Sequence, residues 1–189
     1  MSPMTRWLVG ATVGVVALDQ LTKWLTRANL RERVDEVQVI PGWFAFANAQ
    51  NKGAAFSALA DSEHRIVIFL SFTALAVLVI AAASRLLHPQ DRWPGAAVGT
   101  LLAGALGNAI DRALFGQVTD MFKVSAGSGP LKVWAMENFR TNVWPIFNIA
   151  DIAIWVGVLG FPLAWMFLAP RAPTAPGAEP AEGSAPTLD

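Results

Sequence analysis

The stretch that decides the fold is PIFNIADIAIWVGVLGFPLAWMFLAP, residues 145–170. From Ile152 to Leu168 it is almost wholly apolar, as is typical of a helix that lies in lipid. Asp151 stands at the head of this helix, three residues after Asn148. An ionisable side chain near the end of a membrane helix costs free energy, so we expect Asp151 to have a partner or a function.

The composition of the whole chain agrees with a membrane protein. Of its 189 residues, 54% are hydrophobic and only 15% are charged, and the mean hydropathy is +0.43. A soluble domain of this length would carry more charge and shorter apolar runs. The formal net charge is zero, and no basic stripe is visible, so we expect no nucleic-acid partner.

The chain has no cysteine and only two histidines, His64 and His88, which lie far apart in the sequence. This excludes disulfides, thiolate nucleophiles and cysteine-based metal sites, and it argues against a histidine-rich metal cluster. We therefore expect no metal ion and no organic cofactor. Any chemistry is expected to rest on carboxylates.

Hydropathy predicts a mainly α integral membrane protein with four transmembrane helices. Their approximate bounds are 7–24, 66–87, 95–115 and 149–168, within a membrane domain that covers residues 1–169. An even number of spans places both termini on one side of the membrane. The two long loops, about 27–64 and 116–147, then share the other side.

Both long loops carry signs of β structure. In the first loop, β-type residues flank Pro41 and Gly42, which predicts a short hairpin. The second loop begins as a strand in GQVTDMFKV and runs into a Gly/Ser turn. Residues 170–189 are rich in Pro, Ala and Gly, and we expect them to be a disordered tail.

The charge distribution argues against the expected orientation. Four basic residues lie on the side of the termini, and the other ten of the fourteen lie near the long loops. The positive-inside rule would therefore place the long loops in the cytoplasm.

Asp19 and Lys23 lie one helical turn apart near the end of the first span. This spacing puts them on one helix face, where they can pair. We interpret them as a structural ion pair that anchors the helix end. Direct contact with a substrate is the alternative.

The third span carries a row of small residues that lets another helix approach closely. The row consists of Gly95, Gly99, Ala103 and Gly107. It leads into Asn108, Asp111 and Arg112. The pair Asn108 and Asp111 repeats the spacing of Asn148 and Asp151 at the end of the fourth span.

For Asp151 a purely structural account remains open. Asn148 can cap the helix by accepting from the backbone N–H of Ala150 or Asp151. An acid in the first turn also complements the helix dipole.

Asp120, in the predicted strand, is the second acid of interest. The chain must return to the same membrane surface to begin the fourth span, so Asp120 and Asp151 can meet there. Two close carboxylates share a proton, so that one takes a proton from water while the other donates to a carbonyl oxygen. Asp111 is a rival, which we discount because Arg112 and Lys123 offer it cationic partners.

Asn51 and Gly53 follow the predicted hairpin in NKGAAF. The glycine allows close backbone approach or a positive φ. A polar loop that re-enters the membrane with a glycine turn is the alternative. A nucleophilic pair of Ser57 with Lys52 has no support in the sequence.

Five stretches in this order resemble the lipoprotein signal peptidases, the bacterial signal peptidase II family of membrane aspartyl proteases. They are DQLTK (19–23), NKGAAF (51–56), GNAIDR (107–112), GQVTDMF (116–122) and FNIAD (147–151). The resemblance implies that Asp120 and Asp151 are the catalytic pair. It also implies site-lining or bracing roles for Asn51, Asn108, Asp111, Arg112 and Asn148, and a fold-stabilising role for Asp19 and Lys23.

The resemblance implies further properties of the protein. The family removes the signal peptide of prolipoproteins just before a diacylglyceryl-modified cysteine, and inhibition by globomycin-type compounds is expected. It works at the outer face of the bacterial cytoplasmic (inner) membrane, with both termini in the cytoplasm and a small antiparallel β-cradle and a lid segment over a pocket. We therefore expect the orientation of the family and not the one that the positive-inside rule favours.

One segment departs from the family pattern. SAGSGPLKVWAMENFRTNVW, residues 125–144, has no obvious family counterpart. Since Trp134 and Met136 are apolar in an otherwise polar loop, we predict that they dip into the membrane interface near the lipid of the substrate.

Two other classes of protein are alternatives. A small proton- or ion-coupled transporter would use intramembrane carboxylates, but transporters usually have more spans, repeats and broken helices. A non-catalytic assembly factor would use its acids only to cap and pair.

Overall fold

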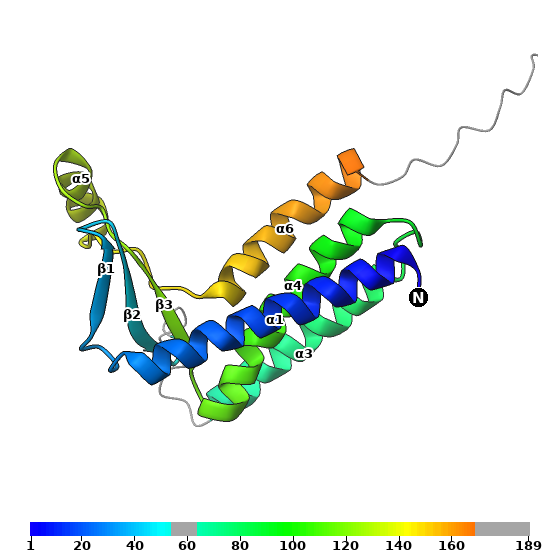
Figure 1. Ribbon diagram of the computed structural model, residues 1–189, viewed down its shortest axis with the longest axis horizontal. Helices are drawn as coiled ribbons and strands as arrows, with labels where there is room; N and C mark the ends of the chain where they lie inside the picture. Colours follow the sequence, from blue (N-terminus) through cyan, green and yellow to red (C-terminus); the bar gives the residue numbers. More distant parts are fainter. Residues whose placement is uncertain (54–63, 169–189) are drawn as a thin grey trace, which may run out of the picture.

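The computed structural model describes residues 1–53 and 64–168. The elements are α1 (Pro3–Asn29), β1 (Glu36–Ile40), β2 (Phe44–Asn51), α3 (Arg65–Ser84), α4 (Arg92–Phe115), β3 (Val118–Val124), α5 (Pro130–Phe139) and α6 (Ile149–Leu168). The four long helices form a bundle, and the sheet with α5 projects from one end of it (Figure 1). The tail 170–189 and Ser57 lie outside the described residues.

The helix ends follow local sequence signals that hydropathy does not register. The α1 helix begins at the N-cap Ser2, whose Oγ accepts a 3.1 Å hydrogen bond from Thr5 N, and it has Pro3 in its first turn. It therefore extends beyond the predicted bounds 7–24 at both ends. The α4 helix ends at Gly116, which has φ 69° and donates its N–H to Arg112 O at 3.0 Å. A left-handed residue at this position is the usual helix terminator.

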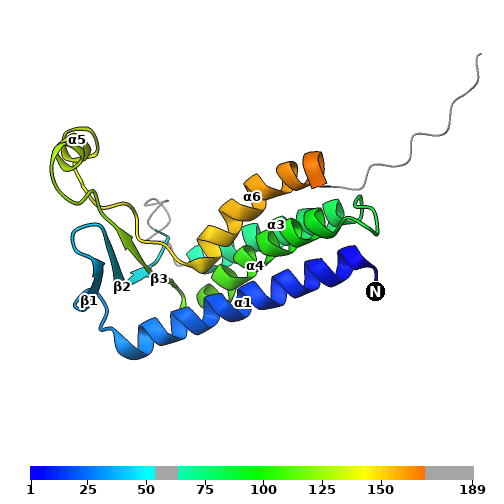
Figure 2. The same cartoon turned by 45° about the horizontal axis from the view of Figure 1, so that its top comes forward.

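The α4 helix is the centre of the bundle and packs against α1, α6 and α3 (Figure 2). A Cβ added at Gly99 would lie 2.2 Å from Leu8 O, and one at Gly104 would lie 2.4 Å from Ala150 O. Gly99 therefore lets α1 approach closely, as its place in the small-residue row predicted. Gly104, outside that row, does the same for α6.

In the bundle, charged side chains are buried and many large apolar side chains are exposed, which is the reverse of the pattern in a soluble protein. Asp19, Lys23 and Asp111 are completely buried, whereas Leu78 and Trp155 are each 67% exposed. Apolar side chains on the outside suit a protein whose solvent is lipid. Among the described residues, α1 and α6 are long and apolar enough to cross a membrane.

The sheet has the order β1-β2-β3, and both pairs are antiparallel. The predicted hairpin is confirmed, with Gly42 at φ 79° between β1 and β2. Opposite β3, a register irregularity lies between Phe46 and Ala49, and Ala49 then pairs with Asp120. Asp120 therefore lies on β3, the strand of the sheet that contacts both α1 and α4.

The segment after β3 contains α5, a helix that the sequence did not predict. After α5 the chain returns alongside β3, where Trp144 N donates to Val124 O at 2.9 Å and Phe147 N donates to Phe122 O at 3.2 Å. We call the sheet together with residues 125–147 the arm. Its return leg leads directly into α6.

Candidate active site

The arm projects from one end of the bundle (Figure 1). A cluster of buried polar residues lies at this end, on α1, α4, β3 and the start of α6. Its most buried members are each no more than 7% exposed; they are Asp19, Lys23, Asn108, Asp111, Asp120 and Asn148. Burial of this many polar groups is tolerated only when they have hydrogen-bond or ion-pair partners.

The N-terminus of α6 is held by a reciprocal cap. Asp151 N donates to Asn148 Oδ1 at 3.0 Å, and Asn148 N donates to Asp151 Oδ2 at 3.2 Å. Ala150 N donates instead to Asp19 Oδ1 of α1, at 2.9 Å. These bonds satisfy backbone donors that a helix start leaves without partners. Asp151 thus has the structural contacts that the alternative account predicted.

The remaining contacts of Asp151 and Asp120 join the two acids. Asp151 Oδ1 accepts from Asn108 Nδ2 at 2.9 Å. Asp120 Oδ1 accepts from Asn148 Nδ2 at 2.6 Å, and Asp120 Oδ2 accepts from Asn51 Nδ2 at 3.1 Å. Since Asn148 binds both carboxylates, the structure brings Asp120 and Asp151 to one site.

The environment of Asp120 favours its protonated form. Burial, and then the negative charge of Asp151, raises the pKa of Asp120 to about 7, although hydrogen bonds from Asn51 and Asn148 oppose the shift. Desolvation and a nearby like charge both disfavour ionisation. A carboxyl that titrates near neutrality is able to donate a proton in catalysis.

Lys23 of α1 links Asp19 to Asn108 within the cluster. Its Nζ lies 2.9 Å from Asp19 Oδ2 and donates to Asn108 Oδ1 at 3.0 Å, and both members of the ion pair are fully buried. Asn108 in turn donates to Asp151. The predicted pair of Asp19 and Lys23 therefore forms, and it orients Asn108 as well as anchoring the helix.

The ion pairs of Asp111 among the described residues are with cations other than the expected Arg112 and Lys123, although the charge of Asp111 also acts on Arg112. Its carboxylate lies 3.6 Å from Lys23 Nζ and 3.7 Å from Arg27 Nη1, and it accepts from Thr119 N at 2.8 Å. Lys123 pairs with Glu36 instead. Asp111 therefore does lie between two cations, but α1 supplies them, not α4 or β3.

Arg112 and Gly53 lie against Phe69 of α3. The guanidinium of Arg112 lies 4.8 Å from the centroid of the Phe69 ring. The negative charges of Asp151 and Asp120 attract this guanidinium. Gly53 has φ +98°, and a Cβ there would lie 2.6 Å from the same ring. Asn51 Oδ1 accepts from Gly53 N at 2.8 Å, which orients the amide that donates to Asp120.

Sequence reasoning missed two residues of α1. Arg27 pairs with Asp111 and donates to Thr119 Oγ1 at 2.8 Å. Gln20 Nε2 donates to Asp19 Oδ2 and to Gly107 O, each at 3.1 Å. The four-residue spacing of Asp19, Lys23 and Arg27 was a usable signal, because it puts all three on one helix face.

The chain is similar to known proteins over most of its length. The model of the family described as signal peptidase (SPase) II matches residues 11–167. A lipoprotein signal peptidase of Geobacter sulfurreducens is 37% identical over 158 residues, which cover 84% of this chain and 90% of the relative. One of Syntrophotalea carbinolica is 40% identical over 144 residues, which cover 76% of this chain and 81% of the relative.

Solved structures show the same fold. A bacterial membrane enzyme determined by the in meso method at 2.3 Å resolution aligns with a TM-score of 0.63 at 27% identity and covers 84% of this chain and 87% of its own. A second, at 1.9 Å resolution, has a TM-score of 0.65 at 26% identity and covers 86% and 94%.

Proposed function

The chain belongs to the signal peptidase II family of aspartic endopeptidases, and we propose that it cleaves prolipoproteins just before a diacylglyceryl-modified cysteine, with Asp120 and Asp151 as the catalytic pair. The observation that carries the proposal is the Asn148 side chain, which binds Asp120 while its backbone binds Asp151. This family membership does not favour the transporter alternative.

In the proposed reaction, Asp120 is the proton donor and Asp151 is the base. A pKa of about 7 lets Asp120 hold a proton near neutral pH and donate it to the carbonyl oxygen of the scissile bond. Both oxygens of Asp151 are acceptors of N–H donors, which suits a carboxylate that takes a proton from water. The water oxygen bonds to the carbonyl carbon, which gives a gem-diol. The C–N bond then breaks, the amine leaves with the proton from Asp151, and one hydroxyl of the gem-diol returns a proton to Asp120 as the carbonyl reforms.

The proposal includes four spans, with α3 and α4 crossing the membrane beside α1 and α6. Support comes from the bundle, in which the N-terminus and the last turn of α6 lie at the end away from the arm (Figure 1). We place that end in the cytoplasm and the arm at the outer face of the inner membrane. There the diacylglyceryl chains can stay in the bilayer while the peptide meets water at the aspartate pair. A lid segment over this site and sensitivity to globomycin-type inhibitors remain predictions.

The test is a gel-shift cleavage assay with purified protein in bilayer nanodiscs. The substrates are a diacylglyceryl-modified prolipoprotein and its unmodified form. The unsubstituted protein should cleave only the modified substrate, and D120N and D151N should each lose at least about 1,000-fold in rate, as for loss of a catalytic group.

The control is Asp111→Asn, since Asp111 is buried as Asp120 is but lies between Lys23 and Arg27. This variant should lower the thermal stability more than the rate per folded molecule. Cleavage that survives in D120N or D151N would exclude that residue from the pair. Equal cleavage of the unmodified substrate would exclude the lipid requirement.

A further inference from the structure

The arm has one apolar face and one polar face. Side chains alternate along β3, so Asp120, Phe122 and Val124 share a face, and Lys123 lies on the other. On the apolar side, four rings contact one another with centroids 5.4–6.2 Å apart; they are those of Phe44, Phe46, Phe122 and Phe147. The polar side carries the ion pair of Lys123 with Glu36. The apolar face therefore begins beside Asp120 and continues outward.

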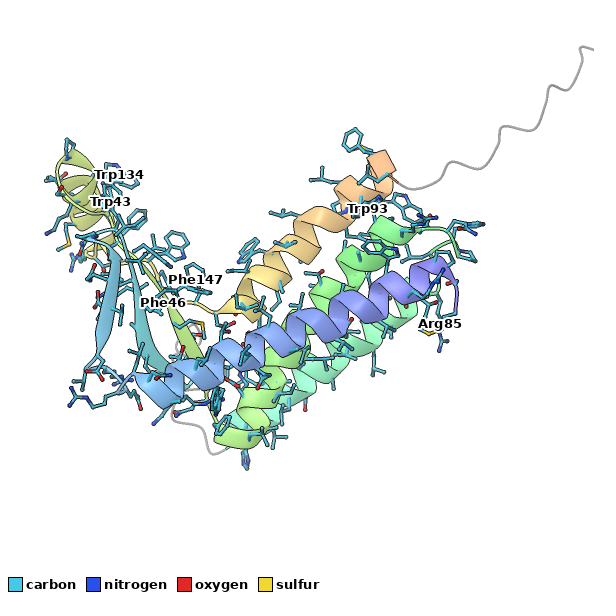
Figure 3. All side chains as sticks on the ribbon, viewed as in Figure 1. Trp43, Phe46, Arg85, Trp93, Trp134 and Phe147 are labelled. Atoms are coloured by element: carbon cyan, nitrogen blue, oxygen red, sulfur yellow. The ribbon has the colours of Figure 1, made fainter. Side chains whose placement is uncertain are left out.

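This apolar face is turned toward α6. Phe46, Phe147, Trp43 and Trp134 follow one another along the side of the arm that faces α6, and Trp134 is near the tip (Figure 3). The exposed side of α6 is itself apolar, since Trp155 is 67% exposed and Leu159 is 59% exposed. The α6 helix is long and apolar enough to span a bilayer, so in a membrane the apolar face of the arm would lie next to the exposed apolar side of a spanning helix.

The tip of the arm exposes large apolar side chains on several sides. In α5 only Ala135 is buried, and the exposed fractions are 47% for Leu131, 55% for Val133, 53% for Trp134, 45% for Met136 and 64% for Phe139. Trp134 and Phe139 also contact each other edge to face, with centroids 5.4 Å apart. An apolar patch of this kind on a folded protein marks an interaction surface.

The chemistry of this surface matches the interface of a bilayer. Indole rings favour the headgroup level, where one end is apolar and the other is wet. The exposed cations Lys132 and Arg140 lie in α5 and directly after it. They can reach lipid phosphates while the apolar side chains enter the acyl boundary.

We propose that α5 is an interfacial membrane anchor, which inserts Trp134 and Phe139 into the leaflet on the arm's side of the membrane. The proposal rests on the membrane arrangement described above, but it does not depend on which aspartates are catalytic. It extends the predicted insertion of Trp134 and Met136 from two side chains to a whole element.

Such an anchor would act on the site through both legs of the arm. The outgoing leg, β3, carries Asp120, and the return leg leads to Asn148 and Asp151. The legs are joined near the tip, where Ala126 N donates to Asn142 O at 2.7 Å. The depth of α5 in the interface would therefore fix the height of the aspartate pair above the acyl chains.

The tip is also fastened to the hairpin turn. Ser125 N donates to Trp43 O at 2.8 Å. The Trp43 ring lies over Gly127, where an added Cβ would be 2.1 Å from it. A fixed position of α5 would therefore also restrict the position of the sheet.

The test uses the absence of cysteine, because a single introduced cysteine takes a spin label at one known position. Leu131→Cys and Phe139→Cys report on α5. Gln38→Cys, which is exposed on the polar face of the hairpin, is the matched aqueous control, and Leu159→Cys on α6 is the lipid control. Each labelled full-length protein is placed in nanodiscs of phosphatidylethanolamine and phosphatidylglycerol, and the accessibility to oxygen and to a water-soluble nickel chelate is measured.

The expected result is high oxygen and low nickel accessibility at 131 and 139, at depths of about 5–10 Å below the phosphates. Nickel accessibility equal to that at position 38 would overturn the proposal, because α5 would then lie in water. Protection from both reagents would overturn it as well, since α5 would then be covered by protein. Loss of cleavage in D120N or D151N has no bearing on any of these outcomes.

Discussion

The side-chain amide of Asn148 donates a 2.6 Å hydrogen bond to Asp120. The same residue caps α6 and exchanges two hydrogen bonds with Asp151. One asparagine therefore fixes an acid on a strand relative to an acid on a helix. The sequence alone posed structure and function as alternatives for Asp151, but its contacts serve both.

Replacing Asn148 with alanine should disorganise the pair without removing either acid. We expect kcat to fall by about 100-fold, because small displacements of catalytic groups have effects of this size. The matched control is Asn29→Ala, since Asn29 is exposed and binds only Leu25 O among the hydrogen bonds observed here. Both variants are assayed for cleavage in nanodiscs. An Asn148→Ala protein as active as Asn29→Ala would show that the bridge is dispensable.

The activity should decline as the pH rises through the pKa of Asp120, which is about 7, because the proposed donor then loses its proton. The hydrogen bond from Asn51 lowers this pKa by favouring the ionised form. Asn51→Ala should therefore shift the alkaline limb of the pH profile of kcat/KM to higher pH. The expected shift is about one pH unit, for the loss of one hydrogen bond to a charged group. A limb at the same pH or at a lower pH than in the unsubstituted protein would contradict this assignment of Asp120.

The same shift affects stability. Between pH 4 and 7 the folded protein holds a proton on Asp120 that the unfolded chain releases, so this group's contribution to stability falls as the pH rises through that window. Asp120→Asn should remove at most roughly 4 kcal/mol of this pH dependence. The check compares the Tm of the two proteins at pH 5 and pH 8. The gain of the variant over the unsubstituted protein should be larger at pH 8, and the same gain at both values would count against the raised pKa.

Lys23→Met should strongly destabilise the protein. It leaves the buried carboxylates of Asp19 and Asp111 without a cation that lies 2.9 and 3.6 Å away, and breaking such a pair costs about 3–5 kcal/mol. Arg31→Met is the control, because Arg31 is 76% exposed in its pair with Asp35 and should change Tm little. Equal Tm values for the two variants would argue against a structural role for Lys23.

Gly99→Ala should separate α4 from α1, since its Cβ would lie 2.2 Å from Leu8 O. Overpacking of this kind costs about 1–3 kcal/mol. Gly14→Ala is the matched control, because a Cβ at Gly14 meets nothing within 4 Å. Thermal unfolding in detergent should show a lower Tm for Gly99→Ala alone. A Tm as high as that of Gly14→Ala would mean that the helices do not approach so closely.

The sequence by itself determined the features that depend on local pattern and composition. Apolar runs predicted the long helices, the residues around Gly42 predicted the hairpin, and the spacing of Asn148 and Asp151 predicted the cap. Five short motifs in order resembled the family to which the chain belongs. These signals are readable because hydrophobic length, turn chemistry and helix capping act between residues close in the chain.

Only the tertiary structure decided which distant residues meet. It paired Asp111 with Lys23 and Arg27 of α1, and it linked Asp120 to Asp151 through Asn148. It also showed α5 at the tip of an arm whose apolar face is turned toward α6. Such pairings depend on the close approach of helices at glycines and on strand register. Both arise from packing between elements, and no local pattern in the sequence specifies them.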